Sequence, residues 1–158
     1  FFAWFTHRPA AGAAVDAAQV GTQYWVVGDA RFEARSLRLD SVFSATGTSF
    51  GPGLDFNDLG VKRWGSARID LVSCTEALFT WDSTGANSAN FGSGSYPIYR
   101  YFENEDTARC RQQGLDHADR SWVIGQWWGR ESRSGEGLFL DRRTDGTTFF
   151  AWFTHRPR

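Results

Sequence analysis

Few residues of this chain have the type and spacing that catalysis requires. The segment G-T-S-F-G (47–51) matches G-x-S-x-G, the pattern that places a serine nucleophile, here Ser49, on a sharp strand-to-helix turn. In this sequence the pattern lies in a Gly/Pro-containing loop with no helix after it. The histidines His7, His155 and His117 are not accompanied by any motif that would complete a catalytic triad. We therefore expect a protein that is not an enzyme.

One acidic segment resembles a cation-binding loop. In D-F-N-D-L-G (55–60), Asp55, Asn57 and Asp58 offer oxygen ligands. A calcium loop needs such ligands at regular offsets and a distal carboxylate, and this spacing is only partly right. We expect no metal and no cofactor.

The two cysteines, Cys74 and Cys110, form the next candidate pair. An even count without a C-x-x-C motif favours a disulfide over a metal or redox site. The alternative is two unrelated buried thiols. A disulfide indicates an oxidising compartment, so we expect an extracellular or cell-surface protein.

The tryptophans are the remaining candidates for binding chemistry. A platform for sugar rings could be formed by Trp122, Trp127, Trp128 and Trp25, and an exposed row could also include Trp4, Trp64 and Trp81. The alternative is a core or interface role, because large aromatic side chains dominate the packing of small β domains. Exposed aromatic patches are uncommon in soluble monomers, which favours the core role.

The most informative feature is a repeat. The nine residues F-F-A-W-F-T-H-R-P occur at 1–9 and again at 149–157. As a strand, the second copy is apolar on both faces, which is typical of a strand in the middle of a packed structure. A domain has one place for such a strand, so we expect the other copy to dock on another molecule. The predicted assembly residues are Phe149, Phe150, Trp152 and Phe153, with their counterparts Phe1, Phe2, Trp4 and Phe5.

The elements that would position these residues are short strands. Aromatic residues make up 16% of the chain, and 17 glycines mark many turns. A hairpin is predicted from 137–143 and 147–155 around T-D-G, with further strands at 23–28, 31–43, 66–73, 77–81, 97–102 and 121–129. Within 31–43, Leu37, Leu39 and Phe43 alternate with Arg38, Asp40 and Val42. Within 66–73, Ala67, Ile69 and Leu71 are predicted to face one way and Arg68 and Asp70 the other. We predict an all-β fold, an antiparallel meander of about eight strands in a barrel or sandwich with little helix.

The polar stretch that follows the second cysteine indicates a boundary. We assign 1–110 to the main part of a β domain, 111–121 to a linker, and 122–158 to the first strands of the same repeat type, which would belong to or complete the next unit. The alanine-rich stretch 11–20 is expected to be a loop or a single helical turn. The chain would then correspond to one period of a longer repeat whose start and end do not coincide with the boundaries of a domain.

The segments W-W-G-R-E-S-R-S-G-E-G-L (127–138) and F-F-A-W-F-T-H (149–155) resemble a β-rich module of bacterial secreted and surface proteins. The resemblance extends to G-S-A-R-I-D-L-V-S-C-T-E-A-L-F-T-W (65–81) and P-I-Y-R-Y-F (97–102), in permuted order. It implies a secreted protein whose modules occur in tandem, and it implies no activity.

Charge and hydropathy limit the partners. The net charge is −1, without a basic stripe, which argues against nucleic acid. No apolar run is long enough to span a membrane as a helix. The sequence predicts a subunit or tandem repeat of an extracellular filament that joins other copies of itself head to tail. The alternatives are a module that binds glycans or another small ligand through its tryptophans, and an accessory domain of a secreted enzyme.

Overall fold

A computed structural model of the chain describes residues 23–46, 55, 57, 60–85, 91–133 and 135–155. This part of the chain is mostly β-strand with one α-helix, α1 (Glu105–Gln113). The strands are β1 (Gln23–Glu33), β2 (Ser36–Thr46), β3 (Gly60–Leu71), β4 (Glu76–Asp82), β5 (Ser93–Arg100), β6 (Gly125–Trp128), β7 (Gly137–Arg142) and β8 (Thr148–His155). The predicted all-β fold is confirmed.

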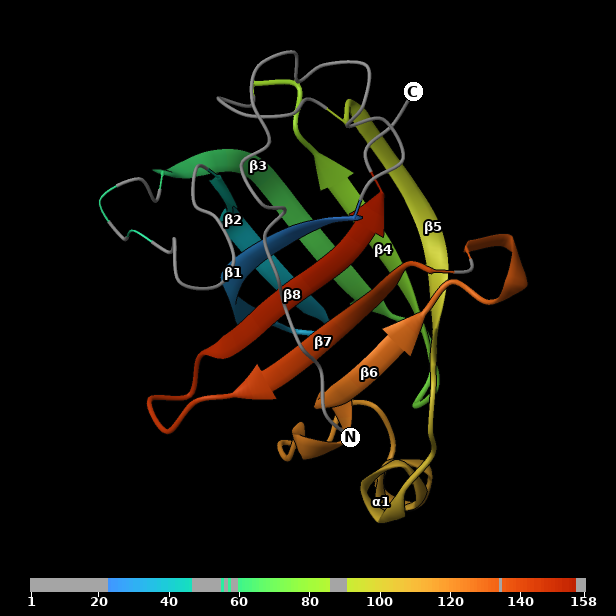
Figure 1. Cartoon of the computed structure of the whole chain (residues 1–158). Coiled ribbons are helices and arrows are strands. Elements are labelled where there is room, and N and C mark those ends of the chain that lie inside the picture. The colour runs from blue at the N-terminus through green and yellow to red at the C-terminus, as the bar shows by residue number, and fades with distance from the viewer. Residues whose placement is uncertain are drawn as a thin grey trace.

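The strands form a closed barrel in which each strand pairs antiparallel with the next along the chain and β8 pairs with β1 (Figure 1). The pairing of β8 with β1 runs from Gln23↔His155 to Ala30↔Thr148. We call the end of the barrel at Gln23 and His155 the upper end and the end at Glu33 and Thr148 the lower end. Closure leaves no free edge among the eight described strands, which is the usual way for a meander to avoid pairing with other chains.

The β7–β8 hairpin forms as its Asp-Gly turn predicts. Gly146 adopts φ 85°, a conformation that glycine reaches without strain. The Asp145 Oδ1 atom accepts hydrogen bonds from the backbone N–H of Thr147 (2.9 Å) and from its hydroxyl (2.7 Å). These two hydrogen bonds hold the pKa of Asp145 below its usual value.

Alternate residues of each strand fill the barrel, as the period of a strand requires. In β3, Ala67, Ile69 and Leu71 are buried, as predicted. In β2 the alternation shifts, because the pairing with β3 is irregular between Leu39 and Phe43. Val42 is therefore fully buried, whereas Phe43 is 38% exposed. A bulge of this kind reverses the faces of the residues that follow it.

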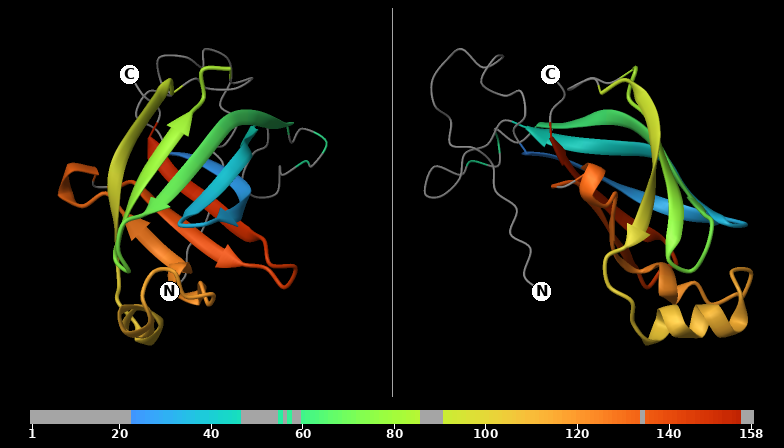
Figure 2. Two further views of the ribbon diagram at one scale, coloured as in Figure 1. Left: turned by 180° about the vertical axis from the view of Figure 1, so that it is seen from behind. Right: turned by 90° about the vertical axis from the view of Figure 1, so that its right-hand side faces the viewer.

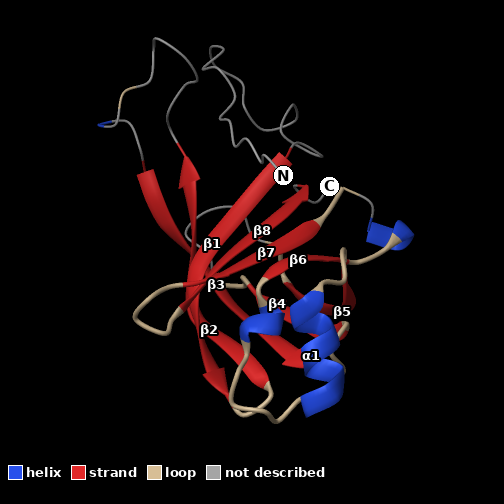
Figure 3. Cartoon of the chain, turned by 90° about the horizontal axis from the view of Figure 1, so that it is seen from below, coloured by secondary structure: helices blue, strands red, loops and turns tan. Residues whose placement is uncertain are grey.

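The lower end is covered by α1 and the 3₁₀ segment Ser121–Val123 (Figures 2 and 3). The helix begins at Asn104, whose side-chain oxygen accepts from the Thr107 N–H (3.0 Å) while the Thr107 hydroxyl accepts from the Asn104 N–H. No helix was predicted here from the sequence, and this capping box was missed.

A buried arginine joins the lower end to the barrel. Arg100 of β5 donates from Nη1 to the carbonyl oxygens of Val123 (3.3 Å) and Ile124 (2.6 Å). Its guanidinium lies 5.3 Å from the centre of the Trp127 ring. Burial lowers the pKa of Arg100 from its usual value, which lies far above neutral pH.

The domain organisation differs from the one we expected. We placed a boundary after Cys110 and assigned 122–158 to a neighbouring unit. In the structure β6, β7 and β8 close the same barrel as β1 to β5, and the predicted linker 111–121 contains the end of α1 and the start of the 3₁₀ segment. The chain crosses the lower end of the barrel there, held by the disulfide between Cys74 and Cys110.

Within the described ranges, no helix combines the length and the apolar character needed to cross a membrane.

Candidate functional site

An aromatic cluster fills the upper half of the barrel, with Trp152 of β8 at its centre. The centre of the Trp152 ring lies 4.9 Å from that of Phe79, 5.4 Å from that of Trp81 and 5.5 Å from that of Trp64. Tyr96 joins the cluster through edge-on contacts with Phe79 (5.6 Å) and Trp81 (5.7 Å). We call these five residues the upper cluster. They come from β3, β4, β5 and β8, so only the closed barrel brings them together.

Strand register explains how the rings fit. Phe79 lies opposite Tyr96 and Trp81 lies opposite Gly94 in the β4–β5 ladder. A Cβ atom at Gly94 would lie 2.6 Å from Cζ2 of Trp81, so the indole needs a glycine opposite it. The missing side chain leaves room for a ring that lies over the β5 backbone.

The upper cluster contains polar atoms that are buried but not paired. The indole nitrogens of Trp64, Trp81 and Trp152 and the hydroxyl of Tyr96 have no hydrogen-bond partner within the described part of the chain. The Trp152 indole lies close enough to the Tyr96 hydroxyl to lower the pKa of Tyr96, but the two groups do not have hydrogen-bond geometry. Leaving a buried donor unpaired costs about 1–3 kcal/mol, so unpaired groups of this kind are unusual. Four such atoms belong to the upper cluster.

A polar rim lies beside the cluster. The Arg133 guanidinium sits 4.6 Å from the centre of the Tyr96 ring, and its Nη1 atom lies 3.5 Å from Oε2 of Glu136. The Thr154 hydroxyl donates to Oε1 of Glu136 (2.9 Å), whereas Oε2 is buried and accepts no hydrogen bond from a described residue. Burial raises the pKa of Tyr96 above its usual value, and the negative charge of Glu136 adds to the effect. Tyr96 therefore keeps its proton at neutral pH.

The four tryptophans predicted as a platform do not converge. Trp122 and Trp127 are buried towards the lower end, and the Trp127 indole donates to the carbonyl of Val123 (3.0 Å). Trp128 is half-buried against Tyr101, with ring centres 5.3 Å apart. Trp25 is half-buried and lies opposite Phe153 in the β1–β8 ladder. Among the tryptophans considered from sequence, Trp64 and Trp81 reach the site. Their convergence depends on the pairing of strands distant in sequence, which no local pattern indicated.

The predicted assembly residues of the second repeat copy belong to β8, a strand of this barrel. Phe150 and Trp152 point into the core, and Phe149 and Phe153 are half-buried on the outer face. Both ladders of β8 are occupied, by β7 on one side and by β1 on the other. The first copy, with Phe1, Phe2, Trp4 and Phe5, lies outside the described residues.

The other chemical candidates that the structure describes are not brought together into one site. Ser49, Asp58 and His7 lie outside the described residues. Asp55 accepts from the backbone and side-chain nitrogens of Asn57, each at 2.9 Å, and the His117 Nδ1 atom accepts from the N–H of Asp119. In the ranges that the structure describes, no three His, Cys, Asp or Glu side chains are arranged to hold a metal ion.

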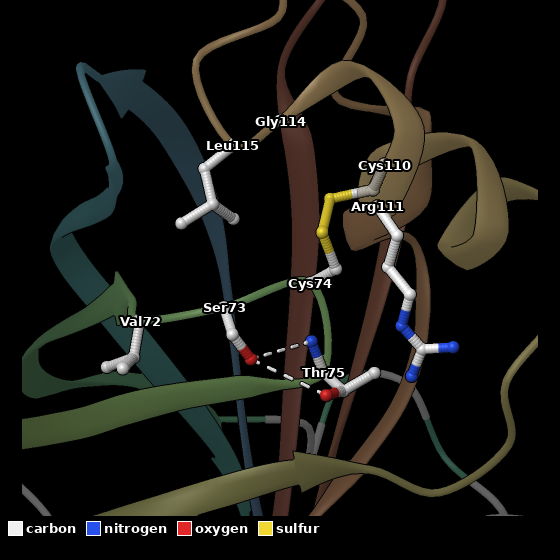
Figure 4. A pocket seen from close by; sticks show the side chains of 8 residues that line it. All are labelled: Val72, Ser73, Cys74, Thr75, Cys110, Arg111, Gly114 and Leu115. Carbon is white, nitrogen blue, oxygen red and sulfur yellow. Dashed lines mark hydrogen bonds between the residues drawn. A yellow bond between two sulfur atoms is a disulfide. The ribbon is translucent and has the colours of Figure 1, made fainter.

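The predicted disulfide is confirmed and lines an open pocket of about 270 Å³ at the lower end (Figure 4). The bond joins the β3–β4 turn to α1. On the turn, the Ser73 hydroxyl accepts from the Thr75 N–H (3.2 Å), and Val72 and Leu115 complete the apolar side of the pocket. These contacts fix the helix under the barrel, so we assign the pocket a structural role.

Comparison of the chain with protein-family models, curated proteins and solved structures returned no significant match. The fold and the site therefore rest on the chain itself: an eight-stranded meander barrel with an aromatic, donor-rich upper end.

Proposed function

We propose that the chain is a non-enzymatic binding module that holds a small, oxygen-rich ligand of the saccharide class at the upper cluster. Barrels of eight strands have an interior that side chains fill or that accommodates one small ligand. The observation that carries the proposal is the set of buried, unpaired donors around Trp152.

The chemistry of the cluster fits this class of ligand. Aromatic faces pack against the C–H faces of a sugar ring, and indole N–H groups donate to its oxygens. The Oε2 atom of Glu136, which lies 3.5 Å from Nη1 of Arg133 but accepts no hydrogen bond from a described residue, accepts from a hydroxyl group of the ligand. Ligand sites of proteins are commonly lined by apolar and aromatic side chains with a few placed polar groups, and the upper cluster with its rim has that composition.

Titration followed through the indole N–H signals tests the proposal. With ¹⁵N-labelled protein and a panel of soluble oligosaccharides (cellohexaose, maltohexaose and hexa-N-acetylchitohexaose), we expect the signals of Trp64, Trp81 and Trp152 to shift. The Trp127 signal is an internal control, because its N–H already donates to Val123.

A pair of variants sharpens the test. Trp152→Phe keeps a ring in the cluster but removes its N–H, and it should weaken binding about tenfold or more. Trp128→Phe makes the same change outside the cluster and should leave affinity unchanged. The proposal fails if no oligosaccharide moves the cluster signals, or if both variants weaken binding equally.

A second candidate function, self-assembly, is favoured by the repeat. Because residues 1–9 are identical to 149–157, the first copy can in principle occupy the place of β8 in another molecule. We propose that such strand exchange links chains head to tail into an extracellular filament. The disulfide supports the oxidising location that this role and ligand binding share.

Removing residues 1–9 tests the assembly without touching β8. Light scattering over a range of concentrations should show oligomers for the intact chain and for Thr6→Ser, which keeps every apolar position. Deletion of 1–9, or Phe2→Glu with Trp4→Glu, should give monomers with an unchanged circular dichroism spectrum. A chain that is monomeric at every concentration, or that assembles equally without 1–9, would exclude this candidate.

A further inference from the structure

A second pocket lies at the lower rim of the barrel, away from the upper cluster. Its volume is about 650 Å³, and three segments line it: the end of β1 with the turn that follows, residues 118–120, and the β7–β8 turn. Its charged lining residues are Arg31, Arg120, Arg142 and Asp145. Three positive charges against one negative charge make the pocket electropositive, although the whole chain carries a net charge of −1.

The three arginines are incompletely compensated by neighbouring acids: Asp116 acts on Arg120 only from beyond ion-pair distance, and it already pairs with Arg35. In the described part of the chain, Arg31, Arg120 and Arg142 form no ion pair with a carboxylate, whereas nine other ion pairs occur. The Arg120 Nη1 atom is buried and has no hydrogen-bond partner among those residues, while Nη2 donates to the carbonyl of Ala34 (3.4 Å). A buried guanidinium nitrogen without an acceptor is costly, so an acceptor from outside the chain would stabilise it.

The acids near this pocket are already engaged. The Asp145 Oδ1 atom accepts two hydrogen bonds from Thr147. Asp116 is held by Arg35 through a two-point contact, and Asp29 pairs with Arg143 (3.1 Å). Asp116 and Asp29 are therefore shared with arginines outside the pocket, and the single charge of Asp145 leaves a surplus of positive charge among the lining residues.

We propose that the lower-rim pocket binds a doubly charged oxyanion of the phosphate or sulfate type. Guanidinium groups present planar pairs of N–H donors that match the oxygens of such anions. Two or three guanidinium groups around one pocket balance the charge of the anion and fix its orientation. Phe32 and Ala118 supply an apolar wall next to the arginines. A phosphate monoester with an apolar substituent, which keeps two negative charges, therefore fits better than the free anion.

Calorimetric titration of the full chain with sodium phosphate, sodium sulfate and phenyl phosphate tests the proposal, with ionic strength held constant by sodium chloride. We expect saturable binding of all three anions and tighter binding of phenyl phosphate. Preference for phenyl phosphate identifies an ester as the ligand class, whereas equal affinity identifies the free anion; both outcomes support an oxyanion site.

Two variants, each lacking one positive charge, distinguish a specific binding site from a general effect of charge. Arg142→Gln should weaken phosphate binding about tenfold or more, because a hydrogen bond between two charged groups is lost. Arg38→Gln removes the same charge from the outer face of β2, where Arg38 pairs with Asp40 (2.8 Å), and should leave affinity unchanged. Binding that does not saturate, or equal loss in both variants, would overturn the proposal.

Discussion

Replacing Gly94 by alanine should disrupt the upper cluster. The added Cβ would lie 2.6 Å from Cζ2 and 2.7 Å from Cη2 of Trp81. Carbon atoms normally pack about 3.5–4.0 Å apart, so the indole must move by about 1 Å. Its neighbour Trp152 is 5.4 Å away, ring centre to ring centre, and cannot make room without moving as well. Overpacking of this kind costs about 1–3 kcal/mol.

Thermal unfolding, followed by circular dichroism, measures the effect. In a chain of this size each kcal/mol lowers the melting temperature by about 2–4 °C, so Gly94→Ala should melt about 2–12 °C below the parent. Gly85→Ala is the matched control, since a Cβ there meets no atom within 4 Å. We expect the control to change stability by no more than about 0.5 kcal/mol.

A double variant distinguishes the clash from a general effect of the substitution. Trp81→Leu removes the ring that the new Cβ would meet, so Gly94→Ala should cost much less in the Trp81→Leu background than in the parent. If Gly94→Ala is as stable as Gly85→Ala, or if its cost is the same in both backgrounds, the packing described for Trp81 is wrong.

Three further perturbations test other parts of the structure. Replacing both Cys74 and Cys110 by serine removes a crosslink between residues 36 positions apart, which should cost about 4 kcal/mol and lower the melting temperature by about 8–16 °C; an unchanged melting temperature would contradict the crosslink. Burial raises the pKa of Tyr96, so above pH 10, the usual tyrosine value, the unfolded chain loses this proton first and stability falls as pH rises. In urea unfolding, the free energy of unfolding of Tyr96→Phe should fall less steeply above pH 10 than that of the parent. Identical declines would contradict the burial of the Tyr96 hydroxyl. Arg100→Ala should lower the free energy of unfolding, measured in urea, by about 2 kcal/mol or more, since two charged hydrogen bonds disappear. Arg111→Ala, at an exposed ion pair, should lower it by about 0.5 kcal/mol or less. Equal losses would contradict the role of Arg100 at the lower end.

Much of the fold could be predicted from the sequence because its signals are local. Alternation in β3 places Ala67, Ile69 and Leu71 inside the barrel, and the Asp-Gly turn defines the β7–β8 hairpin. The cysteine count favoured the disulfide that the structure contains. In each case the residues that carry the signal are the residues that make the contact.

The missed features depend on local geometry or on distant pairing. The helix cap at Asn104 uses a threonine three residues later, and the acidic first turn could have indicated it. The irregular pairing of β2 exchanges the faces of Val42 and Phe43 without any change in composition.

The candidate site was harder to predict because its residues come from four strands. Trp64, Phe79, Tyr96 and Trp152 meet only after the register of the whole barrel is set. Trp64 and Trp81 were among the tryptophans considered from the sequence, but composition alone could not decide which tryptophans point to one place. The boundary assigned after Cys110 came from polarity, and the polar segment proved to cross the lower end of one barrel.

The most direct measurement is the set of backbone nuclear Overhauser effects of β8 in dilute, isotope-labelled protein. The barrel predicts that Trp152 lies beside Val26 on one side and Leu138 on the other. A mixture of labelled and unlabelled chains should show no such contact between molecules. Contacts of Trp152 with only one neighbouring strand, or contacts with β1 that arise only between different chains, would contradict a barrel that each chain closes for itself.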